Sequence, residues 1–428
     1  MPIRTHAVAR RLVFAALVAV APFLARRAAT DETIPPVEGA AEPGDAAPSF
    51  FDGLWEAVSG GDVGFNLRVR GELVEQTGLD TARALTERVR LGYETRPFHG
   101  FSARVEFEDI RTPDDDRFNA AGLNANPRKA VVADPEDTEL NQGFFKYAHE
   151  YAAVVAGRQR ITLDDHRFVG DVGWRQNEQT YDAFTLSSNA IPDTTLFYGY
   201  LADVNRVFGP SSGRDFESDS HLFNASYNGL SCGKLTAFAY LLDFDNAAAN
   251  SSDTYGLRFA GKQAIAGDFS TTYAASYAHQ NDAGDNPVDY DAEYFFLEAM
   301  LAVAGVGSGG AGYELLGSDD SAASFATPLA TLHKFNGFAD VFLQTPVAGL
   351  QDAYAKAGTK LPCDVSLTAF FHWFWTDDTS AELGNELDFV VEKPWTKNVK
   401  TLLKVAIFDG SSGLPDREVY WLQTEIDF

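Results

Sequence analysis

Apolar and polar residues alternate along most of this chain with a period of two, beginning near residue 64. In the segment 65–73 the two kinds of side chain follow one another in turn: Phe65, Asn66, Leu67, Arg68, Val69, Arg70. Successive side chains of a β-strand point to opposite faces, so this pattern predicts a strand with one apolar and one polar face. Segments 85–94 and 101–108 repeat the pattern, although Glu87 interrupts the apolar face of the first.

Comparable segments recur to the end of the chain and bring the total to about eighteen, separated by turns of Gly, Asn, Asp and Pro. After the first three they lie at 140–148, 152–161, 179–187, 194–202, 220–228, 233–243, 253–262, 268–280, 289–301, 309–317, 350–360, 364–375, 384–393, 398–408 and 419–428. No helical pattern separates them, which excludes a parallel α/β sheet. The spacing, about 20 residues per strand and connection, suits short turns alternating with longer loops.

The polar faces carry charged residues in mid-strand, which suits a water-filled lumen better than a dry core. The last segment, Tyr420–Phe428, ends on an aromatic residue, as the closing strand of an outer-membrane barrel does. Open sheet edges cannot be left in lipid, so such a sheet must close. We predict an all-β fold: a transmembrane antiparallel barrel of about 18 strands over residues 61–428, with loops in the lumen or outside the cell.

The amino-terminus predicts export. Arginines precede the apolar run Leu12–Leu24, which is typical of a secretory signal peptide within residues 1–29 and is too short for a membrane-spanning helix. Ala19–Ala21 fits the small-x-small cleavage rule, but Pro22 follows directly, so the cut stays open; a short buried helix is the alternative. Residues 30–60 predict a disordered leader followed by a short amphipathic helix near 50–58. That helix either plugs the periplasmic mouth or frames the first strand.

The formal net charge of −27 argues against a nucleic-acid partner. Acidic residues gather in turn-like stretches near 114–116, 134–139, 282–291, 319–320 and 377–378. These stretches either solvate exposed loops or bridge to lipopolysaccharide through divalent cations. We expect a monomer in contact with outer-membrane lipids. Cys232 and Cys363 either form one disulfide or stay unpaired, and neither belongs to a metal or redox motif.

The polar faces of the early strands carry a basic ladder with interleaved carboxylates. The residues predicted to line the lumen are Arg68, Arg70, Glu72, Arg88, Arg90, Arg104, Glu106, Arg158, Arg160, Glu386 and Asp388. Guanidinium groups stay charged and bind carboxylates in a fork geometry. A wall of this kind either selects among charged solutes or stiffens itself through salt bridges, and both can hold together.

Enzyme motifs are absent from the sequence: there is no nucleophile elbow, zinc-protease helix, phosphate loop or dinucleotide fingerprint. Eight histidines are scattered along the chain, and the segment Asp164–Arg167 and His333 are the alternative candidates for metal or catalytic groups. We therefore expect no enzyme activity, no cofactor and no metal.

Three segments resemble the alginate-export-type family of outer-membrane porins, in particular its uncharacterised branch: Gly157–Ile161, Arg167–Gln179 and Ala323–Asp340. The likeness covers about residues 60 to 428. It implies an eighteen-stranded barrel with an electropositive lumen that conducts an acidic polysaccharide, and it implies that Arg158 faces that lumen. This chain departs from the family in its strongly acidic composition, which argues against alginate itself and leaves passive conduction intact.

Segments 165–180 and 323–346 are too irregular for wall strands, and loops of such length normally have a function. We predict that at least one folds into the lumen as a constriction lined by Arg167, Trp174, Arg175, His333 and Lys334; an extracellular cap is the alternative. The sequence thus predicts a diffusion channel for charged or carbohydrate-like solutes. A structural or plugged barrel is the alternative, and a barrel enzyme a more distant one.

Overall fold

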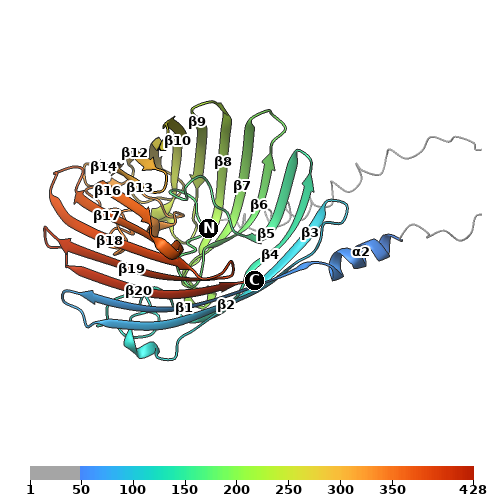
Figure 1. The fold of residues 1–428 in the computed structure, drawn as a ribbon, viewed down its shortest axis with the longest axis horizontal. Helices are drawn as coiled ribbons and strands as arrows, with labels where there is room; N and C mark the ends of the chain where they lie inside the picture. Colours follow the sequence, from blue (N-terminus) through green and yellow to red (C-terminus); the bar gives the residue numbers. More distant parts are fainter. Residues whose placement is uncertain (1–48) are drawn as a thin grey trace, which may run out of the picture. The chain divides into compact units, whose positions relative to one another are not determined.

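Eighteen antiparallel strands form one sheet that closes on itself in the computed structural model, which describes residues 49–428 (Figure 1). The strands are β1 Asp62–Gln76, β2 Ala82–Glu94, β3 Phe101–Arg111, β4 Asp137–His149, β5 Ala152–Gln159, β6 Thr180–Ser188, β7 Thr194–Asn205, β8 Phe216–Leu230, β9 Gly233–Leu242, β10 Ser252–Ala266, β11 Phe269–Asp282, β12 Asp291–Val303, β13 Gly307–Leu316, β16 Leu350–Lys360, β17 Ser366–Trp375, β18 Glu382–Pro394, β19 Val399–Gly410 and β20 Arg417–Asp427. Each pairs with its neighbours along the chain, and β1 also pairs with β20. The predicted closed barrel of about 18 strands is confirmed.

The remaining elements are short. Helix α2 (Phe50–Ser59) precedes β1, and the hairpin β14 (Ser318–Asp319) with β15 (Ala323–Ser324) lies in the loop after β13. Single 3-10 turns occupy Asp115–Arg117, Pro210–Ser212, Ala248–Asn250, Leu332–Lys334 and Pro362–Asp364. Among residues 49–428, no helix combines the length and apolar character needed to cross a membrane.

The wall carries its apolar side chains outward and its charged side chains inward. On β1 the guanidinium-bearing Arg68 and Arg70 are 8% and 0% exposed, whereas Val69 between them is 40% exposed. The same alternation puts Trp421 of β20 inside and Leu422 outside, at 1% and 58% exposure. A soluble sheet shows the opposite arrangement, so the wall is built to face an apolar surrounding.

The two mouths of the barrel differ. Short turns, such as 95–100, 150–151 and 231–232, join strands at the mouth where β1 begins and β20 ends, here called the short-turn mouth. The long connections lie at the other end, the long-loop mouth: 112–136, 160–179 and 317–349. Outer-membrane barrels place their short turns in the periplasm and their longer loops outside the cell.

Several expectations fall at the edges of the barrel. The predicted signal peptide and the leader up to residue 48 lie outside the described residues. Helix α2 occupies the segment near 50–58 and lies outside the ring of strands, beside the β2–β3 turn (Figure 1). Cys232 and Cys363 are both exposed and unpaired, each in a turn of the short-turn mouth.

Candidate functional site

The loops 160–179 and 317–349, here called the inner loops, pack against each other. Val169 and Leu329 form a parallel bridge between them. The amide of Gly170 donates to the carbonyl of Leu329 at 2.9 Å, and the amide of Thr331 donates to the carbonyl of His166 at 3.0 Å. Because the backbone groups satisfy one another across the pair, the inner loops form one ordered body.

Arginines on the inner face of the wall hold this body by its backbone. Arg68 donates through Nη1 to three successive carbonyls, those of Gly173, Trp174 and Arg175, at 3.0, 3.2 and 3.2 Å. Arg70 Nη2 donates to the Trp174 carbonyl at 2.5 Å. These contacts place residues 173–175 on the lumen side of β1.

The same arginines are paired with carboxylates. Arg68 and Arg88 both contact Glu425 of β20, at 3.1 and 3.2 Å. Arg90 Nη1 lies 3.0 Å from Glu178 of the inner loops, and Arg90 also pairs with Glu108 of β3. The inward arginines of β1 and β2 are therefore neutralised where they stand, not presented as unpaired cations.

The network extends along β3 and into the first inner loop. Glu106 accepts from Arg104 at 2.5 Å and from Arg160 at 2.7 Å, and Arg160 also pairs with Glu178. Asn141 of β4 donates to Glu106 at 2.9 Å and to Glu178 at 2.6 Å. Glu178 thus joins one inner loop to two strands of the wall, β2 through Arg90 and β4 through Asn141.

Arg158 occupies a different position from the rest of the ladder. It is in register with Asp182 of β6 and donates to that carboxylate at 2.7 and 3.0 Å. The adjacent residue, Gln159, is the buried one, at 5% exposure. Arg158 therefore lies apart from the network around Glu106 and Glu178.

Trp174 lies at the centre of the contact between inner loops and wall. Its ring stacks on His333 with centroids 4.4 Å apart and planes 6° apart, and it meets the edge of Trp421 at 5.7 Å. The guanidinium carbon of Arg70 lies 4.2 Å from the centre of the Trp174 ring. Stacking and cation–π attraction both favour this arrangement in a desolvated site.

His333 links the wall to a second arginine. Its Nε2 lies 2.7 Å from Nζ of Lys404 on β19, and its Nδ1 lies 2.7 Å from Oδ1 of Asp340. An ammonium group only donates, so Nε2 accepts and Nδ1 carries the proton that it donates to Asp340. Oδ2 of Asp340 accepts from Arg175 Nη2 at 2.5 Å.

The inner-loop groups have shifted pKa values. Burial lowers the pKa of His333 to about 3, against the opposing effect of Asp340, so the imidazole is neutral near pH 7. Burial acts to raise the pKa of Asp340, but its contacts with His333 and Arg175 outweigh burial and hold that pKa below its usual range. The charges of His333 and Asp340 are therefore fixed over the neutral pH range.

Both inner loops have further anchors on the wall, Arg167 in the first loop and Ala339 in the second. Arg167, 2% exposed, forms two hydrogen bonds to Glu314 of β13 at 2.6 and 3.3 Å. Glu386 of β18 accepts from the amide of Ala339 at 2.7 Å. Gly337 has a φ of +83°, and a Cβ there would stand 2.4 Å from a Glu386 oxygen, so only glycine fits.

The remaining predicted residues take varied places. Asp388 is fully buried and lies 3.7 Å from Nε2 of His372. Glu72 is 4% exposed and lies near Arg175 and Asp340 of the inner loops. Lys334 is exposed and donates to the carbonyl of Asp165 at 2.7 Å. Sequence reasoning missed Lys404 and Asp340, although the polar face of β19 and the segment 323–340 contain them.

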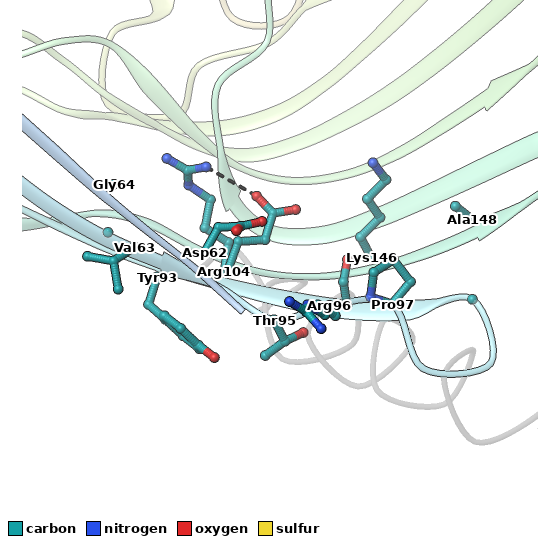
Figure 2. Close-up of a pocket in the computed structure, with 14 residues that line it drawn as sticks. Asp62, Val63, Gly64, Tyr93, Thr95, Arg96, Pro97, Arg104, Lys146 and Ala148 are labelled. Atoms are coloured by element: carbon teal, nitrogen blue, oxygen red, sulfur yellow. Dashed lines mark hydrogen bonds and ion pairs between the residues drawn. The ribbon is translucent and has the colours of Figure 1, made fainter. Parts of the chain in front are cut away.

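Two spaces remain on either side of the inner loops. The outer cavity, about 780 Å³, opens at the long-loop mouth, and its lining includes Arg167, Arg175, Arg206, Phe208, Phe216 and Phe342. The inner pocket, about 320 Å³, lies at the short-turn mouth (Figure 2). Its charged lining residues are Asp62, Glu94, Arg96, Arg104 and Lys146.

Along β1, the pocket residues Asp62–Gly64 precede Arg68 and Arg70, which hold residues 173–175. Residues 173–175 therefore lie between the inner pocket and the outer cavity. Figure 2 shows Arg104 and Lys146 on the opposite side of the strands from Tyr93. Within residues 49–428, no group of three or more His, Cys, Asp or Glu side chains is arranged to hold a metal ion.

Comparison with known proteins identifies the family of this chain and solved structures with a similar fold. A model of the family described as "Alginate export" matches residues 61–394. Similar solved structures include OccAB3 and OccAB2 of Acinetobacter baumannii and OccK8 (OprE) of Pseudomonas aeruginosa, with TM-scores of 0.68, 0.67 and 0.66. They are 13%, 15% and 14% identical, over 86%, 86% and 87% of this chain and 99%, 98% and 99% of theirs. At such identities the likeness concerns the fold. No curated protein sequence matches this chain.

Proposed function

Because the chain belongs to the alginate export family and lies in the bacterial outer membrane, we propose that it is a passive channel for small acidic or carbohydrate-like solutes. The observation that carries the proposal is the arrangement of two charged spaces in one lumen, separated by inner loops that the wall arginines hold in place. This barrel has the architecture of a selective channel with a narrow middle. In a wide conduit, by contrast, no loop would occupy the middle of the lumen.

The charges favour anions at both ends of the path. The outer cavity is lined by three arginines and no carboxylate; Arg167 and Arg175 are paired with Glu314 and Asp340 behind the lining, so Arg206 contributes most of the cationic charge. The inner pocket contributes Arg96, Arg104 and Lys146 against two carboxylates. Cationic walls raise the local concentration of anionic solutes and so favour their entry.

The narrow middle favours small solutes. Residues 173–175 occupy the space in front of Arg68 and Arg70, so these arginines touch backbone carbonyls where a solute would otherwise pass. An extended acidic polysaccharide needs these groups free and the inner loops displaced. We therefore assign the channel to monomeric or short solutes while the inner loops are docked.

A plugged structural barrel is the second candidate, and one observation favours it. The inward arginines of β1 and β2 are paired with carboxylates or with loop carbonyls, which stiffens the wall and leaves little free charge at mid-height. The two candidates differ in conductance. We propose no catalytic role for any residue.

The acidic stretches fit an outward-facing surface. All five lie in or next to connections of the long-loop mouth, although Asp134 is fully buried and pairs with Arg70 at 3.2 Å. We propose that the exposed members bridge to lipopolysaccharide through divalent cations. Removal of Mg²⁺ with a chelator is then expected to weaken binding of the purified barrel to lipopolysaccharide; equal binding with and without chelator would contradict the bridge.

Single-channel conductance of the refolded protein in planar bilayers, under a KCl gradient, tests the proposal. We expect steady conductance with anion preference, reduced by Arg104→Ala combined with Lys146→Ala. Arg83→Ala, which removes a guanidinium from the outer face of β2, is the matched control and is expected to leave selectivity unchanged. Cation preference would discard acidic solutes, and absence of conductance would favour the plugged barrel.

A further inference from the structure

Helix α2 has three distinct sectors around its axis. Gly53 and Ala57 face the barrel, and Asp52 and Glu56 form an acidic sector. Between them lies an apolar sector that the protein leaves uncovered: Phe50, Phe51, Leu54, Trp55 and Val58. Phe51 and Trp55 are 77% and 71% exposed, an unusual state for two large aromatic side chains.

The helix is fastened to the barrel along one seam. The hydroxyl of Tyr93 donates to the carbonyl of Val58 and accepts from the amide of Gly61 at 2.9 Å. The amide of Arg96 donates to the carbonyl of Ala57 at 3.0 Å. At the other end of the helix, the Phe50 and Phe98 rings lie 5.1 Å apart. These contacts fix the face that α2 turns away from the barrel.

The seam lies on the outer side of the wall. Tyr93 pairs with Val105, which is 40% exposed, and alternates with the inward Glu94–Arg104 pair. Figure 2 shows the Tyr93 ring on the opposite side of the strands from Arg104, and Figure 1 shows α2 outside the ring. The helix therefore frames the first strand and does not plug the mouth.

The apolar sector continues a surface that the membrane already covers. At the short-turn mouth the outer face of the barrel exposes large apolar side chains on several strands and turns: Phe101 56%, Phe145 72%, Val306 68%, Trp395 63% and Phe428 71%. Aromatic girdles of this kind mark the membrane–water interface in outer-membrane barrels. Helix α2 adjoins this girdle, because its Phe50 ring packs against Phe98 in the turn that precedes Phe101.

We propose that α2 lies in the plane of the periplasmic leaflet, with Phe51, Leu54, Trp55 and Val58 inserted among phospholipid acyl chains. Interfacial helices combine a polar face with an apolar face rich in aromatic residues. The polar sector here is acidic and lacks basic residues, so it offers no attraction to anionic headgroups. The matching partner is neutral phospholipid, bound through apolar burial, with Asp52 and Glu56 turned to the water.

Site-directed labelling of the full-length protein tests this placement. In a Cys232→Ser, Cys363→Ser background, a bimane fluorophore is attached at Trp55→Cys or, as the matched control, at Glu56→Cys on the opposite sector. The barrel is refolded in neutral phosphatidylcholine–phosphatidylethanolamine vesicles, and heat-modifiable electrophoretic mobility verifies folding. We expect brominated lipids to quench the label at 55 several-fold more than the label at 56, and aqueous iodide to show the reverse order.

Equal quenching of both positions by iodide would overturn the proposal, because it describes a helix in water. Energy transfer between differently labelled copies at position 55, with lipid quenching absent, would instead assign the sector to a second copy of the chain and would also overturn it. Phe51→Asp adds a second check that leaves the barrel intact. It is expected to raise iodide quenching at 55, and an unchanged value would count against insertion.

Discussion

Nζ of Lys404, on the inner face of β19, lies 2.7 Å from Nε2 of His333 in the second inner loop. The strand thereby holds the loop through a neutral imidazole whose other nitrogen reaches Asp340. The ammonium also lies 3.1 Å from the centre of the Phe338 ring and 4.3 Å from that of Trp174. One wall lysine thus contacts three aromatic side chains of the inner loops.

Replacement of His333 by alanine removes two buried hydrogen bonds and the stacking partner of Trp174. We expect docking of the inner loops to weaken by about 1–3 kcal/mol, because Lys404 and Asp340 are left unsatisfied. Single-channel recordings should then show larger or noisier conductance than the parent protein. His279→Ala is the matched control, since His279 pairs with Glu293 at the surface. Identical traces for His333→Ala and the parent would refute the attachment.

Acid should release the inner loops through His333. Its pKa is about 3 when docked and about 6.5 when undocked. The docked loop binds the proton less tightly, so the stabilising contribution is fully present above pH 6.5 and is lost as pH falls toward 3. The slope is about 1.4 kcal/mol per pH unit within that window. Conductance measured from pH 7 to 4.5 should rise in the parent and stay flatter in His333→Asn. Parallel pH profiles would contradict this assignment.

Glu178→Gln removes a buried carboxylate that pairs with Arg90 and Arg160. Breaking a buried ion pair by changing one partner costs about 3–5 kcal/mol, since the other charges stay buried. We expect a lower unfolding temperature in heat-modifiability assays in detergent. Glu293→Gln, at a position that is 51% exposed, should change stability by less than about 0.5 kcal/mol. Equal effects of the two substitutions would show that the network stores little stability.

Replacement of residues 322–347 by a short Gly-Ser connection removes most of the second inner loop and leaves β13 and β16 intact. The first inner loop then loses its partner at Val169 and Gly170. We expect conductance to rise several-fold. Shortening of the connection 283–290 at the same mouth is the control, and folding is verified by electrophoretic mobility. A folded variant with unchanged conductance would place the narrowest point elsewhere.

The sequence predicts the wall well because strand alternation is a local signal. The predicted segment 101–108 corresponds to β3, and the predicted polar face of the last segment, with Trp421, Gln423 and Glu425, lies inside the barrel. The register between neighbours follows from this alternation, since a slip of one residue would turn charged side chains into the membrane. Closure of the sheet is also predictable, because a sheet in lipid cannot leave its edge strands unpaired.

The lumen contacts could not be predicted in the same way, because their partners are distant in sequence. Arg68 and Glu425 are separated by 357 positions, and only the closed ring brings them together. A list of inward arginines therefore does not reveal which of them are free and which are paired. The place of Arg158 beside Asp182 illustrates the same gap, since neither alternation nor family resemblance specifies a cross-strand partner.

The seam between β1 and β20 joins the strands that are most distant in sequence. Asn66 pairs with Asp427, so the contact that closes the ring joins the two ends of the barrel sequence. Contacts of such long sequence separation form slowly. Glu425 of β20 is the carboxylate that Arg68 and Arg88 share, so the final strand completes the group of wall side chains that holds residues 173–175. A chain that lacks β20 would therefore lose both the pairing with β1 and the Glu425 contacts of Arg68 and Arg88.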